Sequence, residues 1–174
     1  MRVRVAIIKR VSHADPLQEL NWTEDTIARL HAEGFRKGGA RLAIIELLGR
    51  EPCCLTAMEI FDRLRGEGKR VGIASVYRVL DLLVEHRLAQ RVDVGGGHVR
   101  YEPRHKSGEH HHHIVCDDCG SVEAFSDPKL ERVLRQIEDN VGYTISGHEV
   151  VLHGECDDCK ATTSPRQPSQ HPTS

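Results

Sequence analysis

The sequence contains no apolar run long enough to cross a membrane, so we expect no membrane partner. Its first residues, Met1-Arg2-Val3-Arg4, do not lead into the apolar core of a signal peptide. These two absences predict a cytoplasmic protein whose thiols are reduced and able to bind metal. The chain also lacks a His-Glu-x-x-His motif and the paired motifs of zinc deaminases, which argues against a zinc enzyme.

Neither sign of charge dominates the chain, whose formal net charge is −2 over 174 residues. The two halves differ, however: residues 1–100 hold 17 Lys and Arg against 13 Asp and Glu, whereas residues 101–174 hold 7 against 13. A polyanionic partner would therefore bind to the N-terminal half, although so small an excess does not by itself predict nucleic acid. The length allows two small domains, and a second domain this small usually needs a metal or another staple.

Soft metal ligands, in contrast, are concentrated in one stretch of the chain. The run His110–His113 is followed by Cys116 and Cys119, and a second Cys-x-x-Cys pair follows at Cys156 and Cys159. Two such pairs supply the four thiolates of a structural zinc site. A secreted disulfide framework would be shorter and would carry a signal peptide, and a thioredoxin-like dithiol would lack a matching second pair. The spacing therefore favours zinc.

The four histidines need a separate interpretation, because a closed four-thiolate site has no vacancy for them. Side chains alternate along a strand, so His111 and His113 would face one side and His110 and His112 the other. One short run could then supply ligands to two different metal centres. A purification tag or a solvated loop is the alternative, but tags lie at chain termini and this run is internal.

Residues 23–102 have the pattern of a small helical domain that ends in a hairpin, and residues 1–22 are expected to be a weakly ordered extension with one short strand at residues 3–8. Thr23 is an N-cap candidate, and Thr56 with Glu59 forms a capping box. The predicted helices are Thr23–Glu33, Ala40–Leu48, one that runs from Thr56 to about Gly66, and Ala74–Arg87. The predicted strands of the hairpin are Ala89–Val94 and His98–Glu102, joined by Gly95-Gly96-Gly97.

The fourth predicted helix has two distinct faces. Four apolar side chains converge on one of them: Val76, Val79, Leu80 and Leu83. Tyr77 and Arg78 lie on the opposite face, where a solvated helix would rarely expose a tyrosine. The order of elements indicates a winged helix-turn-helix, in which this helix enters the major groove and the hairpin touches phosphates. We expect Tyr77 and Arg78 to contact bases or phosphates, with Arg41 and Lys37 adding backbone contacts.

The C-terminal half is predicted to be a small α/β dimerisation domain at residues 110–160, after a hinge at residues 103–109. The pattern indicates a strand, a cysteine pair, a second strand, a helix that begins at Asp127-Pro128, and a last strand at Tyr143–Leu152 before the second cysteine pair. So small a unit leaves strand edges and a helix face exposed, which a symmetric homodimer would cover. The Ser- and Pro-rich residues 161–174 are expected to be a disordered tail. The whole is an α+β fold.

Three motifs together resemble the ferric uptake regulator family over residues 24–160: Gly72-Ile73-Ala74-Ser75-Val76-Tyr77-Arg78-Val79-Leu80, the His-rich run before Cys116-x-x-Cys119-Gly120, and Cys156-x-x-Cys159. The resemblance implies a homodimeric bacterial transcriptional repressor that needs a divalent metal to bind a palindromic double-stranded DNA operator and so controls metal-ion homeostasis. The family divides into iron, zinc, manganese, nickel and peroxide-sensing branches, which these motifs do not separate.

The resemblance also implies three metal sites. A structural zinc would be bound by Cys116, Cys119, Cys156 and Cys159; a regulatory metal by Cys54, Glu102, His111 and His113; and an additional metal by His110, His112, Glu131 and His148.

Two departures from the family pattern bear on the regulatory metal. Cys54 stands where the family commonly has His, and Ala124 stands where iron-type members have an acidic residue. A softer site with fewer oxygens favours Zn²⁺, whereas Glu102 favours Fe²⁺, so both are expected candidates and Mn²⁺ is a third. Cys54 could instead be a small buried residue that never touches metal.

Two alternative functions stay open at this point. A peroxide-sensing regulator of the same family would share the motifs described above. A metal storage or chaperone protein that does not bind DNA would explain the metal ligands, but it would leave the exposed Tyr77 and Arg78 unexplained.

Overall fold

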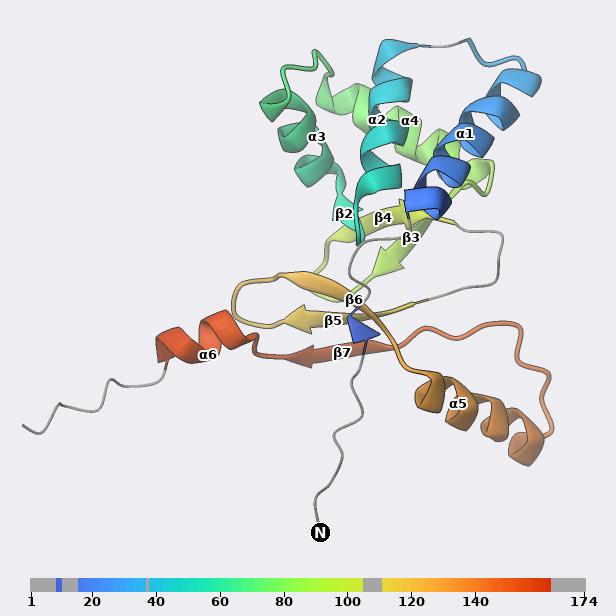
Figure 1. Cartoon of the computed structure of the whole chain (residues 1–174), viewed down its shortest axis with the longest axis vertical. Coiled ribbons are helices and arrows are strands. Elements are labelled where there is room, and N and C mark those ends of the chain that lie inside the picture. Colours follow the sequence, from blue (N-terminus) through green and yellow to red (C-terminus); the bar gives the residue numbers. More distant parts are fainter. Residues whose placement is uncertain (1–8, 11–15, 37, 105–110, 164–174) are drawn as a thin grey trace, which may run out of the picture.

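The structure is a computed structural model of the 174-residue chain, and it describes residues 9–10, 16–36, 38–104 and 111–163. It has the predicted α+β fold, with a unit of four helices and a small sheet next to a second sheet that carries two more helices (Figure 1). Among the described residues, no helix is both long enough and apolar enough to span a lipid bilayer.

The N-terminal unit is a winged helix built in the predicted order. Its helices are α1 (Pro16–Ala32), α2 (Gly39–Arg50), α3 (Ala57–Gly66) and α4 (Ile73–Glu85). Its strands are β2 (Leu55–Thr56), β3 (Ala89–Asp93) and β4 (Val99–Pro103), which form an antiparallel sheet in the order β2-β4-β3. The short strand β2 pairs Leu55 with Tyr101, and this pairing attaches the start of α3 to the hairpin.

The apolar core of this unit follows the helical spacing seen in the sequence. Val76, Leu80 and Leu83 on α4 are fully buried and pack with Ile44 and Leu48 of α2. Each buried side chain of this size contributes roughly 1.5–3 kcal/mol to folding. The same packing turns the opposite face of α4 toward solvent.

The start of α3 has the predicted capping box. The Thr56 side chain accepts a hydrogen bond from the Glu59 backbone N–H at 3.1 Å, and the Glu59 carboxylate accepts one from the Thr56 N–H at 2.7 Å. Two backbone donors that the helix cannot satisfy internally are thereby paired.

The predicted start of the first helix at Thr23 is wrong, because α1 begins at Pro16. Proline is well suited to a first helical turn, where its fixed φ is already helical and its missing N–H is no loss. Tertiary packing then anchors the added turns: Trp22 is buried, and its indole N–H donates to the Leu88 carbonyl at 2.9 Å. The strand predicted at residues 3–8 lies outside the described residues.

The C-terminal unit contains a four-stranded sheet in the order β1-β6-β5-β7. Its elements are β1 (Lys9–Arg10), β5 (His112–Cys116), β6 (Val122–Ser126), α5 (Pro128–Val141), β7 (Val151–Gly154) and α6 (Asp157–Thr163). Strands β5 and β6 are antiparallel, whereas β5 and β7 are parallel. The parallel pairing sets Cys116 opposite Gly154, and this brings the two cysteine pairs to the same end of the sheet.

The prediction of a last strand at Tyr143–Leu152 is wrong for most of its length, since β7 covers only Val151–Gly154. Strand β7 pairs with β5 from His113 to Cys116, and β5 itself begins only at His112. Residues 143–150 therefore have little of β5 left to pair with. At the other end, α6 continues to Thr163 and so includes the first residues of the predicted tail, while residues 164–174 lie outside the described residues.

A small apolar cluster joins the two units. Val92 and Val94 of the hairpin and Cys54 are buried against partly buried valines of the second sheet: Val115, Val122 and Val151. The predicted hinge at residues 103–109 lies largely outside the described residues, but the cluster positions the hairpin directly against β5. The hairpin and β5 carry the side chains of the next section.

Candidate metal centres and nucleic-acid interface

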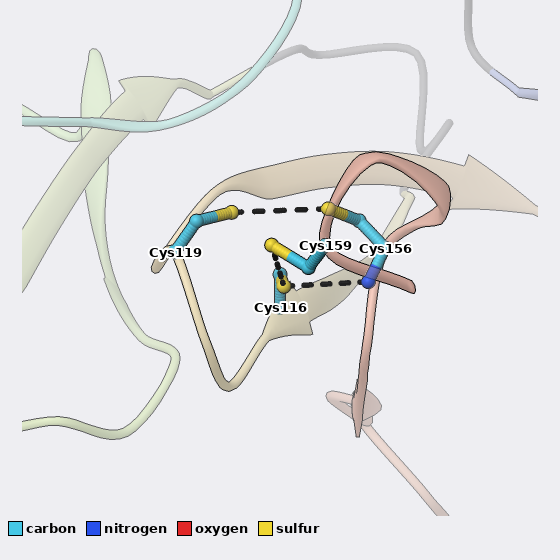
Figure 2. A group of neighbouring side chains, drawn as sticks. All are labelled: Cys116, Cys119, Cys156 and Cys159. Atoms are coloured by element: carbon cyan, nitrogen blue, oxygen red, sulfur yellow. Dashed lines mark hydrogen bonds between the residues drawn. The ribbon is translucent and has the colours of Figure 1, made fainter. Parts of the chain in front are cut away.

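The four cysteines of the two Cys-x-x-Cys pairs converge on one point, as Figure 2 shows. We call Cys116, Cys119, Cys156 and Cys159 the four-cysteine cluster. The sulfur atoms of Cys116 and Cys159 are 3.8 Å apart, as are those of Cys119 and Cys156. Zinc–thiolate bonds of about 2.3 Å in a tetrahedron give sulfur–sulfur edges of about 3.8 Å. The cluster therefore has the dimensions of a tetrahedral zinc site.

Local hydrogen bonds favour the thiolate form of Cys116 and Cys119, whereas the neighbouring Cys156 thiol raises the pKa of Cys159. Gly120 has φ +71°, a left-handed conformation that closes the turn after the first pair. Backbone N–H groups of Cys119 and Cys156 lower the pKa of Cys116 to about 6, and the Cys156 N–H lies 3.3 Å from the Cys116 sulfur. Hydrogen bonding by Ser121 likewise lowers the pKa of Cys119. Thiolates are the form that binds metal.

A second cluster, Glu102 with His111 and His113, lies where the two units meet. We call these three residues the hinge cluster. One oxygen of Glu102, Oε2, is 2.9 Å from His111 Nε2 and 3.0 Å from His113 Nε2. The other oxygen, Oε1, accepts a hydrogen bond from Gln90 at 2.7 Å. Glu102 belongs to β4 and His113 to β5, so the cluster connects the wing to the second sheet.

Burial and pairing oppose each other in the hinge cluster, and pairing prevails. Burial of Glu102 disfavours its charge, but hydrogen bonds from His111 and His113 lower the pKa of the carboxyl to about 2. Burial also disfavours charge on His113, yet the neighbouring Cys53 thiol and Glu102 carboxylate raise the imidazole pKa to about 9. A buried carboxylate between two imidazoles is a preformed divalent-metal ligand set.

Cys54, the fourth residue implied for this regulatory site, groups differently. Its sulfur lies near Cys53 and His113, and these three residues form a separate group of neighbouring ligand atoms. The sulfurs of Cys53 and Cys54 are 3.7 Å apart. The Cys54 thiol lowers the pKa of Cys53 to about 5 by hydrogen bonding, while the same contact raises the pKa of Cys54. His113 is thus common to both groups.

A third group consists of His112, Glu131 and His148. His112 Nε2 lies 2.6 Å from Glu131 Oε1, and His148 Nε2 lies 3.3 Å from Glu131 Oε2. His112 is buried beside the Phe125 ring, on the opposite side of β5 from His113, as the alternation of strand side chains requires. His110, the fourth residue implied for this site, lies outside the described residues.

The exposed face of α4 carries the predicted DNA-contacting residues. Tyr77 is 47% exposed, and Arg78 is exposed beside it. The first turn of α4 contains no acidic residue that would repel a phosphate. Asp81, further along the helix, forms an exposed ion pair with Arg91 of the hairpin at 2.7 Å.

Arg41 is held more tightly than the sequence suggested. Its guanidinium donates to the Arg36 carbonyl at 2.8 Å and lies 5.2 Å from the centre of the Phe35 ring. These contacts close the turn before α2, so Arg41 has a structural role whether or not it also contacts DNA. Lys37 lies outside the described residues.

A sequence profile described as the ferric uptake regulator family matches residues 32–153, well over half of the chain. The chain belongs to the ferric uptake regulator family. The ferric uptake regulation protein of Neisseria gonorrhoeae is 35% identical over 136 residues, which cover 78% of this chain and 93% of the relative.

Solved structures of ferric uptake regulators agree with the profile. The regulator from Vibrio cholerae superposes with a TM-score of 0.65 at 32% identity and covers 74% of this chain and 98% of its own. An iron-containing regulator from Francisella tularensis gives a TM-score of 0.63 at 29% identity and covers 73% and 96%.

Two residues near the hinge cluster were not assigned from sequence. Gln90 belongs to no sequence motif, but it lies opposite Glu102 in the hairpin. A correct prediction of the hairpin register would therefore have identified it. The sequence assigns no role to Cys53, and on an extended chain its side chain would point away from that of Cys54. A bend at Pro52-Cys53 lets both sulfurs converge instead.

Proposed function

We propose that this member of the ferric uptake regulator family is a metal-dependent transcriptional repressor that binds a palindromic operator as a homodimer. The four-cysteine cluster holds a structural zinc. The hinge cluster, with Cys54 as a fourth ligand, binds the regulatory metal, which is Fe²⁺ or Zn²⁺, with Mn²⁺ as a further candidate. His112, Glu131 and His148, with His110, form an additional metal site.

The position of Glu102 carries this proposal. It is 2% exposed on a wing strand, and both of its imidazole partners come from the other unit. A metal that replaces the shared hydrogen bonds would tie the wing to the second sheet with bonds stronger than the contacts it displaces. The separation of the two DNA-binding helices in a dimer would then depend on metal occupancy. Such a bistable connection is the element that an allosteric regulator requires.

The α4 face supports the DNA-binding part of the proposal. An exposed tyrosine and an arginine lie side by side on a helix whose other face is buried in the core. In a winged helix this helix enters the major groove, where Tyr77 would contact a base and Arg78 a guanine or a phosphate. Two such helices, related by a two-fold axis, account for a palindromic operator.

Exposed apolar side chains on the second unit support the homodimer. Ile114 and Leu152 on the sheet are 40% and 45% exposed, and three apolar side chains at helical spacing form an exposed stripe along α5: Val133, Ile137 and Val141. A symmetric interface would cover them. Ile137→Glu should shift the sedimentation coefficient toward that of a monomer, whereas Arg135→Glu, on the side of the helix opposite Ile137, should not.

A two-stage binding experiment tests the regulator proposal. Duplexes are first selected from a random pool with zinc-loaded protein in the presence of added Fe²⁺, Zn²⁺ or Mn²⁺, and we expect a palindrome to be enriched. Fluorescence anisotropy with that duplex then measures affinity with and without each metal. A coupling of about 1–3 kcal/mol would tighten binding by about 5–150-fold.

Variants assign the response to the hinge cluster. Glu102→Gln and His111→Ala should abolish the metal response while leaving the dimer and its structural zinc intact. Glu149→Gln, an exposed glutamate outside every cluster, is the matched control. An unchanged response in Glu102→Gln and His111→Ala would move the sensor to His112, Glu131 and His148. Equal binding of every duplex at all metal concentrations would overturn the proposal.

A further inference from the structure

Cys53 is a half-buried thiol that the proposed regulatory site does not use. It lies between α2 and β2, next to Cys54, which is 2% exposed. The ligand atoms of these two cysteines and His113 all lie within 4.8 Å of one another. Two thiols and an imidazole can fill three of the four positions around a tetrahedral metal ion, which leaves the fourth for water or another ligand.

The spacing of the two sulfurs fits coordination of a common ion. They are 3.7 Å apart, close to the 3.8 Å found twice in the four-cysteine cluster. A disulfide would require about 2.05 Å, so the two atoms are separate thiols. In a tetrahedral zinc–thiolate site the sulfur atoms are about 3.8 Å apart, so a small side-chain movement would bring the two thiols to that distance.

His113 provides an independent observation. The residue is 2% exposed, its Nε2 contacts Glu102, and its Nδ1 is buried without a hydrogen-bond partner. An unsatisfied buried polar atom costs about 1–3 kcal/mol. A metal bound at Nδ1 would satisfy this atom, and the Nε2 proton would then be donated to Glu102.

We propose that Cys53, Cys54 and His113 form a thiolate-rich site for a thiophilic divalent ion of the zinc and cadmium class. This site shares both His113 and Cys54 with the proposed regulatory site, so an ion bound to the thiols competes with the regulatory metal for two ligands. A neutral imidazole has only one unprotonated ring nitrogen, so His113 coordinates one ion at a time. Occupancy of the thiol site therefore removes a ligand from the hinge cluster.

The two sets select different ions. The hinge cluster contributes a carboxylate and two imidazoles, with at most one thiol from Cys54, so it accepts Mn²⁺ and Fe²⁺ as well as Zn²⁺. The thiol site offers two thiolates and one imidazole, which favour Zn²⁺ and Cd²⁺ over the harder ions. A soft ion at the thiol site would then release a harder ion from the hinge cluster by taking away a shared ligand. It would not need to occupy the hinge cluster itself. This inference concerns metal binding alone, and it stands or falls independently of DNA binding.

Titrations without DNA test the competition. The full-length protein, with one tightly held zinc per protomer in the four-cysteine cluster, is loaded with Mn²⁺ in the presence of a phosphine reductant. Cd²⁺ is then added while thiolate-to-cadmium absorption reports thiol binding and the spin-resonance signal of free Mn²⁺ reports release. An indicator dye follows zinc, so that exchange in the four-cysteine cluster is detected. His113→Ala supplies the background from His112, Glu131 and His148.

Two variants should give opposite results. Cys53→Ser should weaken Cd²⁺ binding by at least about tenfold, since even loss of a supporting residue costs that much, and should leave Mn²⁺ affinity unchanged. Glu102→Gln should weaken Mn²⁺ binding and leave the cadmium absorption unchanged. In the wild type, one equivalent of Cd²⁺ should release one equivalent of Mn²⁺.

Three outcomes would overturn the proposal. The first is a cadmium absorption that persists unchanged in Cys53→Ser. The second is simultaneous binding of both ions by the wild type with no Mn²⁺ release beyond the His113→Ala background. The third is absorption matched by zinc release, which would assign the signal to the four-cysteine cluster.

Discussion

The two units of this protein are held together by different means. The winged-helix unit buries a continuous apolar cluster from Trp22 to Tyr101, whereas the second unit buries only Ala124, Phe125 and Cys116 among its apolar residues in the described part of the chain. The first unit can therefore rely on hydrophobic burial, whereas we expect the second to depend on a bound metal and a partner surface. The unit with the poorer core is also the one that carries most of the candidate metal ligands in the described part of the chain.

The four-cysteine cluster and the hinge cluster differ in how they relate to the two units. The four-cysteine cluster lies wholly within the second unit and uses one kind of ligand, so a zinc bound there would stabilise that unit alone. The hinge cluster draws a carboxylate from one unit and imidazoles from the other. A metal bound there would stabilise one arrangement of the two units, and under the proposed function it is this site that would couple metal concentration to the position of α4.

The largest expected effect comes from removing one ligand of the four-cysteine cluster. Cys116→Ser should leave the second unit unfolded, because structural zinc contributes about 10–16 kcal/mol of apparent binding energy that is also folding energy. Hydrogen exchange by mass spectrometry should show protection lost in β5–β7 and retained in α2–α4. Cys53→Ser, which keeps the cluster, is the control. If Cys116→Ser showed the protection and the zinc content of the wild type, the second unit would not depend on zinc for its folding.

A core substitution should have the converse effect on the first unit. Leu80→Ala removes a fully buried side chain and should lower the free energy of unfolding by about 2–5 kcal/mol. Urea denaturation of zinc-loaded protein measures the change. Tyr77→Ala on the exposed face of the same helix should change it by less than about 0.5 kcal/mol. Similar losses in both variants would mean that α4 is not packed as described.

The hinge cluster should make stability depend on pH when no metal is bound there. The His113 pKa rises from 6.5 to about 9, so its contribution is complete below pH 6.5 and is lost as pH rises through 9. The Glu102 pKa falls from 4.5 to about 2, so its contribution is present above pH 4.5 and is lost only as pH falls through 2. Both contributions are present between pH 4.5 and 6.5.

Paired denaturation experiments measure this contribution. The wild type should exceed Glu102→Gln in unfolding free energy by about 1–3 kcal/mol at pH 6, as for hydrogen bonds to charged groups, and by less at pH 10. Glu149→Gln should match the wild type at both values. A difference that grows between pH 6 and 10 would reverse the sign derived for His113.

The smallest predicted effect concerns the start of helix α3. Thr56→Ala removes the side-chain half of the capping box and should cost about 0.5–2 kcal/mol. Thr144→Ala, at an exposed position without a cap, serves as the control in the same urea experiment. Equal midpoints for the two variants would show that the box contributes nothing measurable.

The sequence by itself determined the elements whose signals are local. Helical spacing identified the buried face of α4, the Thr56 capping box fixed the start of α3, and the paired cysteines specified a four-ligand cluster. Each of these depends on residues a few positions apart or on a motif with one chemical use. Alternation along a strand was enough to separate His112 from His111 and His113.

Only the tertiary structure decided what depends on long-range pairing. Trp22 finds its hydrogen-bond acceptor at Leu88, so the true extent of α1 was invisible locally. Strand β7 is short because its partner β5 begins only at His112. Cys53 joins Cys54 and His113 through a backbone bend that no periodicity records. Sequence patterns report which face a residue occupies, but the partner across that face is fixed by packing between distant segments.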